Sequence, residues 1–347
     1  MLSSRHRAWA RGTYWGLGSM ATVLVTGGAG YVGSHVCKAL ARTGHVPVTY
    51  DSLIRGHREL VKWGPLEVGD LHDIARLRQV MTSHRPEVVM HFASFISIAE
   101  SIAQPDLYDH NIVAGTQALA EAMMNEGLKT LVVSSSASVY GTPRDLPITE
   151  GAPCLPVNPY GSAKLRMEQL LSKAQKDHGL AWVALRYFNA AGADPDGEAG
   201  EWHEPEDHLI PLVLDAALGK RDAIRINGDD YPTPDGTCVR DYIHVLDLAE
   251  AHLLAWRYAI GNGGGTAFNL GAGRGASVRE IIATARAVTG RSIPTVIGPR
   301  RPGDPAALVA DISRAKDALG WAPRRSGLAS QIEDAWAWQR ALYARQR

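Results

Sequence analysis

Short apolar, β-branched runs alternate with longer segments of helical periodicity over the first half of the chain. Five of these runs predict strands, namely 22–26 (TVLVT), 46–50 (VPVTY), 87–91 (EVVMH), 130–134 (TLVVS) and 182–187 (WVALRY). Such runs are typical of parallel strands that are buried on both faces of a sheet. Between the third and fourth runs, Tyr108, Ile112, Leu119 and Met123 recur at helical spacing and predict a crossover helix. This order predicts an α/β fold of the Rossmann type, a doubly wound parallel sheet that binds ligands at the carboxyl ends of its strands.

The pattern changes after Asn189, where loops rich in glycine, proline and acidic residues begin. We predict a first domain over 20–189 and a smaller C-terminal α/β lobe over 190–347, with segments near 239–270 packing back on the first domain. The acidic stretch 190–208 lacks the ligand spacing of an EF-hand, so we expect a solvated loop and no metal site. We expect residues 1–19 to form a disordered extension and Met20 to be the natural start.

Composition narrows the range of partners. The 347 residues are 45% hydrophobic, and 36 basic residues balance 36 acidic ones, so net charge gives no reason to expect a nucleic acid or an acidic membrane surface as partner. No apolar run approaches the 18 residues or so that a membrane helix needs. The three cysteines, Cys37, Cys154 and Cys238, are far apart, which argues against disulfides and structural zinc and favours a cytoplasmic location.

A glycine-rich segment follows the first predicted strand and opens a helix. In GGAGYVGSH (27–35), Gly27, Gly30 and Gly33 would allow a tight turn and the close approach of a pyrophosphate to the helix N-terminus. Asp51 ends the second strand, 24 residues after Gly27, where a carboxylate can accept hydrogen bonds from the adenosine ribose. The pattern favours NAD over NADP as the cofactor, and the nearby Arg55 and Arg58 leave NADP open as the alternative. Asp70 fits two interpretations equally, an adenine contact or a cap for the next helix.

A tyrosine and a lysine lie one turn apart on a second predicted helix. In NPYGSAK (158–164), Asn158 suits an N-cap and Pro159 the first helical position, which places Tyr160 and Lys164 on one face. An unperturbed tyrosine has a pKa of about 10 and is a poor base at neutral pH. We expect Lys164, the helix N-terminus and a bound oxidised nicotinamide to lower the pKa of Tyr160 towards what general-base work requires.

Hydroxyl groups cluster after the fourth strand, at 134–136 of the segment SSSASVYG (134–141). Because substrate is expected at the carboxyl end of this strand, we predict that Ser136 shares a substrate hydroxyl proton with Tyr160. The neighbouring serines would satisfy backbone groups of the turn.

Several segments in order resemble the extended short-chain dehydrogenase/reductase family, and within it the nucleotide-sugar 4-epimerases. They are GGAGYVGSH (27–35), HFAS (91–94), SSSASVYG (134–141), NPYGSAK (158–164), RYFNAAG (186–192), VRDYIHVLDLA (239–249) and RPGD (301–304). The resemblance runs from about Ala21 to the end of the chain. It implies an isomerase that interconverts UDP-galactose and UDP-glucose: C4 is oxidised by tightly held NAD, the 4-keto sugar rotates, and hydride returns to the other face.

The resemblance also implies roles for individual residues. Tyr160 would be the base, Lys164 would bind the nicotinamide ribose, and Ser136 would assist proton transfer. The first domain would hold NAD through Gly27, Gly30, Tyr31, Val32, Gly33, Asp51, Asp70, Leu71, Phe92, Ala93, Ser94, Asn111, Ser134, Tyr160, Lys164 and Tyr187. The second lobe would hold the UDP-hexose, with substrate contacts from Ser136, Tyr160, Asn189, Leu209, Arg240, Tyr242, Arg301, Asp304 and Leu308. A homodimer is implied, with helices near 106–126 and 160–178 forming a four-helix bundle.

Other functions remain open from the residues. Leu308 matches the position that admits or excludes an N-acetyl group, and leucine fits either outcome. A UDP-xylose/UDP-arabinose pair is an alternative, because no residue requires a C6 hydroxymethyl group. Dehydrating and decarboxylating relatives usually carry an acid in the serine-rich turn, where this chain has Ala137 and Ser138. From another class, a non-catalytic NAD-binding sensor or scaffold is disfavoured because Tyr160 and Lys164 are both present.

Overall fold

The computed structural model describes residues 20–301 and 303–345, and its central feature is a seven-stranded parallel sheet. The expected extension over 1–19 lies outside the described residues. The strand order is β10-β6-β5-β4-β1-β2-β3. Its members are β1 (Thr22–Thr26), β2 (Val46–Asp51), β3 (Leu66–Val68), β4 (Val88–His91), β5 (Thr130–Ser136), β6 (Ala181–Tyr187) and β10 (Thr266–Leu270). The predicted Rossmann-type sheet is confirmed, and each of the five predicted strands is present.

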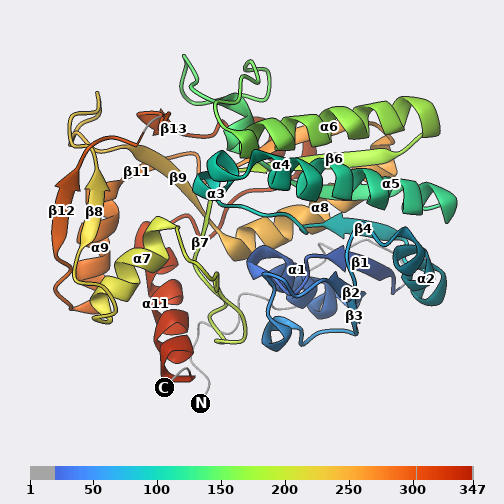
Figure 1. The fold of residues 1–347 in the computed structure, drawn as a ribbon, viewed down its shortest axis with the longest axis horizontal. Coiled ribbons are helices and arrows are strands. Elements are labelled where there is room, and N and C mark those ends of the chain that lie inside the picture. Colours follow the sequence, from blue (N-terminus) through green and yellow to red (C-terminus); the bar gives the residue numbers. More distant parts are fainter. Residues whose placement is uncertain (1–19, 302, 346–347) are drawn as a thin grey trace.

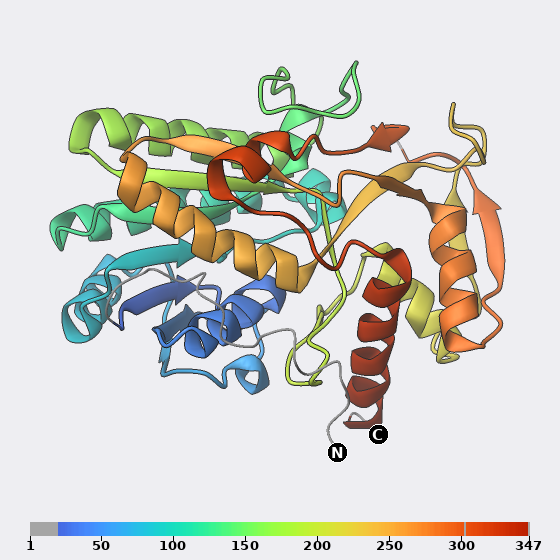
Figure 2. The same cartoon turned by 180° about the vertical axis from the view of Figure 1, so that it is seen from behind.

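Helices cover both faces of this sheet, which explains why its strands lack hydrophobic alternation. On β1, Val23 and Val25 belong to one buried cluster and Leu24 to another. The first cluster lies under α1 (Tyr31–Arg42) and α8 (Val245–Asn262), which run side by side in Figure 2. The second lies under α2 (Ile74–His84), α5 (Gly115–Asn125) and α6 (Pro159–His178).

The predicted crossover helix is confirmed, although it is not a uniform α-helix. The chain forms α3 (Ile98–Ala103), α4 (Pro105–Tyr108), a π-helical turn η3 (Asp109–Ala114) and then α5. The four apolar residues named for their spacing, Tyr108, Ile112, Leu119 and Met123, are all buried in the same cluster. Short 3₁₀ turns η2 (Arg58–Leu60) and η4 (Ala137–Tyr140) follow β2 and β5.

A second region lies beside the sheet, at the left of Figure 1. In it β9 (Val239–His244) pairs with β7 (Asn189–Ala191), β11 (Gly275–Ser277) and β13 (Ala307–Leu308), while β8 (Ile224–Asn227) pairs with β12 (Thr295–Gly298). The helices of this region are α7 (Leu209–Ala217), α9 (Val278–Thr289) and α11 (Leu328–Arg345), whereas α10 (Ser313–Leu319) packs back on α8 and β10. The chain returns to the first sheet through α8 and β10, so both regions contribute to the space between them. In the described part of the chain, no helix combines the length and apolarity needed to cross a membrane.

Candidate dinucleotide and catalytic site

The glycine-rich turn joins β1 to α1 and packs too tightly to accept side chains. Gly27 has a left-handed φ of +73°, and a Cβ atom there would lie 2.5 Å from the backbone nitrogen of Ala93. A Cβ on Gly33 would lie 2.3 Å from the carbonyl oxygen of Gly27. Gly30 is the N-cap of α1 and supplies no side-chain hydrogen bond, so the first N–H groups of the helix are left to an anion. Tyr31 and Val32 follow in the first turn.

Asp51 closes this turn from the end of β2. Its two carboxylate oxygens accept hydrogen bonds from the backbone N–H of Ala29 (3.0 Å) and of Leu53 (2.9 Å). Burial raises its pKa, and these hydrogen bonds act in the opposite direction. Each oxygen keeps a lone pair that could accept a ribose hydroxyl. Asp51 therefore both shapes the glycine-rich turn and faces the expected adenosine side.

Asp70 does not cap the next helix. The N-cap of α2 is Asp73, whose side chain accepts from the backbone N–H of Arg76 at 2.9 Å. Asp70 instead accepts from His72 Nδ1 at 2.7 Å, and half of its side chain is exposed. This geometry excludes the interpretation of Asp70 as a cap, and its contact with adenine stays a prediction; the adjacent Leu71 is buried.

The turn after β4 lies directly against the glycine-rich turn. Ala93 makes the backbone approach to Gly27, and Phe92 packs on the buried cluster under α1. Asn111 accepts from the backbone N–H of Phe95 at 2.8 Å, which ties the turn to η3. Ser94 donates to the carbonyl oxygen of Phe95. The predicted cofactor residues of this segment thus adjoin the glycine-rich turn.

The helix α6, which carries Tyr160 and Lys164, begins as predicted. Asn158 caps it, accepting from the backbone N–H of Gly161 at 2.8 Å, and Pro159 is the first helical residue. Tyr160 and Lys164 share the buried face and are 9% and 2% exposed. Lys164 Nζ donates to the carbonyl oxygen of Ser134 at 3.0 Å and lies 5.8 Å from the centroid of the Tyr160 ring. The helix therefore brings the pair to the carboxyl end of β5.

The pKa values of Tyr160 and Lys164 in the chain by itself are set mainly by burial. Burial raises the pKa of Tyr160 to about 12, while the hydrogen bond with Ser136 acts in the opposite direction. Burial also lowers the pKa of Lys164 to about 7, against a weaker upward effect of Glu168. Removal from water disfavours the charged form of both groups in the chain by itself, so the predicted lowering of the Tyr160 pKa, which includes the positive charge of a bound nicotinamide, stays a prediction.

The three serines at the end of β5 have different partners. Ser135 donates to Glu168 at 2.6 Å within a buried ion pair of Glu168 with Arg186, so its role is structural. The backbone carbonyl of Ser134 receives the Lys164 ammonium. Ser136 hydrogen-bonds with Tyr160 and accepts from the backbone N–H of Ser138 at 3.1 Å. Of the three, Ser136 is therefore the hydroxyl beside Tyr160.

His252 is a site residue that sequence reasoning missed. It lies on α8, is fully buried, and its Nε2 is 2.5 Å from the hydroxyl oxygen of Tyr187. Its Nδ1 lies 2.8 Å from the carbonyl oxygen of Leu248, which favours the tautomer in which Nε2 accepts from Tyr187. The Phe92 ring is 4.7 Å away. No local signal marks His252, because the pairing joins residues 65 positions apart.

Strand pairing brings most of the predicted substrate residues together. In the register of the second region, Asn189 on β7 lies opposite Tyr242 on β9, and Leu308 on β13 lies opposite Arg240. Arg240 forms an ion pair with Asp304. Leu308 also packs against the hydrophobic cluster of the serine-rich turn. The pairing brings Arg240, Asp304 and Leu308 together. The Tyr242 side chain is buried in the hydrophobic cluster of the second region, and Arg301 is exposed and joins Asp304 through a backbone hydrogen bond.

Asp241 is a second residue that the sequence did not single out. It is fully buried between Arg240 and Tyr242 and accepts from the backbone N–H groups of Ala272, Gly273 and Ala310. Burial raises its pKa to about 6, although these hydrogen bonds favour the charged form. Asp241 thereby fixes the strand that carries the predicted substrate residues.

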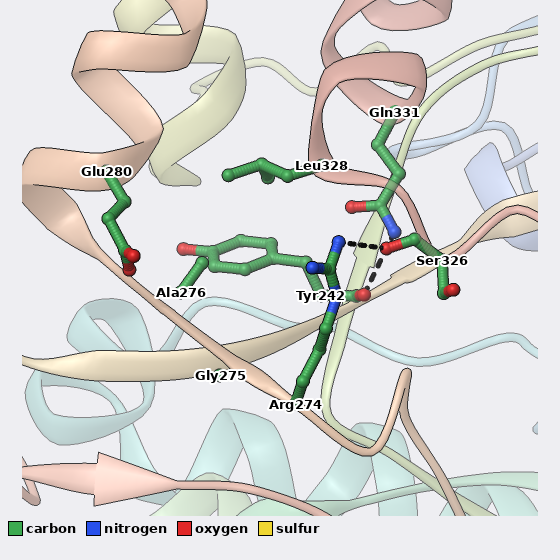
Figure 3. Close-up of a pocket in the computed structure, with 8 residues that line it drawn as sticks. All are labelled: Tyr242, Arg274, Gly275, Ala276, Glu280, Ser326, Leu328 and Gln331. Carbon is green, nitrogen blue, oxygen red and sulfur yellow. Dashed lines mark hydrogen bonds between the residues drawn. The ribbon is translucent and has the colours of Figure 1, made fainter.

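A small cavity of about 70 Å³ lies on the far side of Tyr242 and is lined by Arg274, Glu280 and Gln331 among others. Figure 3 shows the Tyr242 ring extending into it and Gln331 donating to the Tyr242 carbonyl oxygen, at 3.0 Å. Tyr160 and Lys164 do not line this cavity, and it is too small for a nucleotide sugar. We therefore assign the site to the carboxyl ends of β1, β4 and β5 instead.

Comparison with known proteins agrees with this geometry. Residues 23–271 match the model of the NAD dependent epimerase/dehydratase family. A UDP-glucose 4-epimerase of Rhizobium leguminosarum bv. trifolii is 47% identical over 317 residues, which cover 91% of this chain and 97% of the relative. A crystal structure of UDP-glucose 4-epimerase from Brucella ovis in complex with NAD superposes with a TM-score of 0.89 at 48% identity, covering 91% and 98% of the two chains. A UDP-glucose-4-epimerase from Stenotrophomonas maltophila, solved with bound NAD and formylated UDP-arabinopyranose, gives a TM-score of 0.91 at 40% identity, covering 94% and 99%.

Proposed function

The chain belongs to the NAD dependent epimerase/dehydratase family, and on that premise we propose that it interconverts UDP-galactose and UDP-glucose by epimerisation at C4, with NAD as cofactor. The observation that carries the proposal is the buried arrangement of Tyr160, Lys164 and Ser136 beside the glycine-rich turn. The named relatives, which match nearly their whole length, support the choice of sugar.

The residues present fit a dinucleotide. Gly30 leaves the first N–H groups of α1 without a side-chain cap, Asp51 ends β2, and Lys164 is a buried ammonium whose recorded hydrogen bond goes to a single carbonyl oxygen. A buried lysine with unused donors suits ribose hydroxyl groups. Gly27 to Gly33, Asp51 and Asp70 would hold the adenosine and pyrophosphate, and Phe92, Tyr187 and Lys164 the nicotinamide end. NAD, when bound, supplies the acceptor for the C4 hydride and its return to the opposite face.

The chain's own residues would handle the proton. Tyr160 would accept the proton of the sugar 4-hydroxyl, and Ser136, hydrogen-bonded to it, would orient that hydroxyl and share the proton. Burial opposes a charged Tyr160, so the protonated form of Lys164 and the positive nicotinamide must together favour the phenolate when substrate is bound. Ala137 and Ser138 supply no further acid, in keeping with epimerisation without dehydration.

In this proposal one region binds the cofactor and the other binds the nucleotide part of the substrate. Residues 20–189 would bind NAD. UDP would be bound by Asn189, at the boundary between the regions, and by Leu209, Arg240, Tyr242, Arg301 and Asp304 of 190–347, while β10 belongs to the first sheet and α8 packs on it. Arg240 and Arg301 would provide local positive charge for the diphosphate in a protein of zero net charge. Leu308 packs against the serine-rich turn and would line the sugar pocket.

The test uses the purified protein without added cofactor. UDP-galactose and, separately, UDP-arabinose are incubated with the enzyme, and UDP-glucose and UDP-xylose are followed by chromatography. We expect conversion of the hexose and co-purified NAD, and a Tyr160→Phe variant that keeps NAD and loses turnover. Conversion of the pentose alone would overturn the choice of substrate. No conversion of either sugar, even after NAD is added, would overturn the epimerase proposal itself.

We further propose a homodimer formed through α5 and α6, which lie side by side at the upper right of Figure 1. Their adjacency supports a four-helix bundle across a two-fold axis. Light scattering should give twice the 37.4 kDa chain mass. We also propose a cytoplasmic location, supported by the three unpaired cysteines Cys37, Cys154 and Cys238.

A further inference from the structure

The acidic stretch 190–208 is not the solvated loop that its composition predicts. Ala193, Asp194, Ala199 and Glu201 in it are buried. In both ribbon views the loop lies close to α1 and α11, and Glu201 is held there because its carbonyl oxygen accepts from Trp338 Nε1 at 2.8 Å. The expectation was wrong because the loop is covered by elements distant in the sequence. The side chains of Asp194 and Glu201 are therefore largely removed from water, whereas those of Glu198 and His208 stay partly exposed.

Four side chains of this loop, Glu201, His203, Glu206 and His208, converge on one point. One ligand atom from each lies within 4.8 Å of all the others. His203 Nδ1 is 3.4 Å from Glu201 Oε1 and 3.4 Å from Glu206 Oε2. His208 Nδ1 is 3.2 Å from Glu201 Oε1 and 2.7 Å from Glu206 Oε1. Zinc holds such ligands at about 2.0–2.1 Å in a tetrahedron, whose edges are then about 3.3–3.4 Å long. With Glu201 Oε1 as the shared atom, the separations from His203 Nδ1 and His208 Nδ1 are within about 0.2 Å of that length, and Glu206 faces each histidine with a different carboxylate oxygen.

One nitrogen of this group has no hydrogen bond within the described chain, whereas His208 Nδ1 lies 2.7 Å from Glu206 Oε1. His203 Nδ1 is a buried nitrogen without a hydrogen-bond partner among the described residues, and it faces two carboxylates. The ion pairs recorded for Glu201 and Glu206 in the described chain are with these same two histidines. An unpartnered buried nitrogen pointing at carboxylate oxygens is what a cation would satisfy.

A neighbouring group in the same loop provides the contrast. Asp194, Asp196 and Glu198 also converge, but Lys38 Nζ sits among them at 2.6, 2.9 and 2.5 Å. That group already contains its cation and takes no metal. The group of Glu201, His203, Glu206 and His208 combines two imidazole nitrogens, which bind metals in their neutral form, with two carboxylates. Divalent first-row metals prefer this set of donors.

We propose that Glu201, His203, Glu206 and His208 bind one divalent transition-metal cation, with zinc as the best match to the ligand types and spacing. Two carboxylates and two neutral imidazoles balance the charge of the ion, and its binding releases the protons that the histidines otherwise carry. The proposal is independent of the proposed reaction.

The position of this site gives the ion a role in joining the two regions. His208 is the N-cap of α7, directly before Leu209. The His203 ring meets the edge of Tyr31 in the glycine-rich turn, with centroids 6.2 Å apart, and the Tyr31 hydroxyl donates to the carbonyl oxygen of Gly192 at 2.6 Å. A bound cation would therefore fix the start of α7 relative to the turn at the N-terminus of α1, without touching the reacting atoms.

The test measures metal directly on the full chain, purified without a metal-affinity tag. Wild-type protein is analysed by mass spectrometry for zinc, manganese, iron, cobalt and nickel, and the chelator-treated protein is titrated with zinc against a chromophoric competitor. We expect about one zinc per chain, and weakening by more than about a hundredfold in His203→Ala, since partners that only support a ligand already contribute about ten- to a hundredfold.

Two further variants keep the test decisive. Glu206→Gln preserves size and hydrogen bonding, so it reports on the site even if His203→Ala fails to fold, and it too should lose zinc. His84→Ala removes an imidazole that pairs with Glu67 at 2.7 Å on the surface, and it should bind zinc like the wild type. Wild-type protein that neither contains nor takes up a metal, or Glu206→Gln and His203→Ala variants that bind zinc as tightly as the wild type, would overturn the proposal.

Discussion

Two buried lysines of this protein, Lys38 and Lys164, have opposite surroundings. Each is 2% exposed. Burial opposes the charge of Lys38, but the carboxylates of Asp194, Glu198 and Asp196 outweigh it and raise its pKa. Lys164 has no such partner in contact, and burial lowers its pKa to about 7. The loop 190–208 therefore pairs the buried charge of Lys38 with carboxylates. The charge of Lys164, beside Tyr160 on the proposed catalytic face of α6, has no carboxylate in contact among the described residues.

Histidines show the same division between the two regions. Burial lowers the pKa of His91, between β4 and α5, to about 3 and that of His252 on α8 to about 4. In the loop, burial opposes protonation of His203, yet Glu201 and Glu206 raise its pKa to about 10. Buried charges are usually paired, so a buried lysine without a carboxylate in contact is a candidate for binding a ligand.

The largest effect should come from Lys164→Met. Removing the ammonium should reduce epimerisation by between about a hundredfold and ten-thousandfold, because Tyr160 loses the charge that favours its ionised form. Thermal stability should be unchanged or higher, since an uncompensated buried amine is replaced by an apolar side chain of similar length. Turnover and thermal melting of the same preparation check both halves. If the Lys164→Met variant were inactive because it had lost stability, the contrast between Lys164 and Lys38 would be contradicted.

Lys38→Met should lower stability and leave turnover nearly unchanged, the reverse of what we expect for Lys164→Met. It leaves Asp194, which is fully buried, and the partly exposed Asp196 and Glu198 facing one another without a cation. We expect the free energy of unfolding to fall by about 3 kcal/mol, the low end for a broken buried pair. Urea unfolding followed by circular dichroism gives this value. Turnover per folded molecule at 20 °C or so should stay within about twofold of the wild type. If the variant unfolded at the same urea concentration as the wild type, Lys38 would not be needed to stabilise the three carboxylates.

Acid should act on the sheet region through its neutral histidines. The pKa values of His35, His91 and His252 are lowered by burial to about 4, 3 and 4, below the value of about 6.5 in the unfolded chain. Between pH 6.5 and 4.5 the unfolded state binds more protons, so stability falls as pH falls. With three such groups the slope approaches about 4 kcal/mol per pH unit near pH 5. His91→Gln should remove about a third of that slope in urea unfolding at several pH values, and an unchanged slope would show that His91 does not contribute.

The same contrast explains what the sequence could and could not predict. The strands of the sheet, the start of α6 at Asn158 and the turn at Gly27 depend on neighbours in the chain, and their patterns predicted them. The loop 190–208 has no hydrophobic period, and its burial depends on contacts such as Lys38 with Asp194, 156 residues apart. Helical spacing placed Lys164 on the face of Tyr160, but it did not predict that the ammonium would choose the Ser134 carbonyl, nor that burial would raise the pKa of Tyr160.

The smallest effect tests whether burial, rather than distance, separates these lysines. Lys173 Nζ lies 2.5 Å from Asp177 Oδ2, as close as the contacts of Lys38, but 80% of the Lys173 side chain is exposed. Water and salt screen such a pair, so Lys173→Met should leave the thermal midpoint unchanged within error. The variant is also the matched control for Lys38→Met, because both make the same chemical change on an α-helix. If Lys173→Met destabilised the protein as much as Lys38→Met, ion-pair distance alone would decide the outcome, and the comparison between the buried loop and the catalytic face would lose its basis.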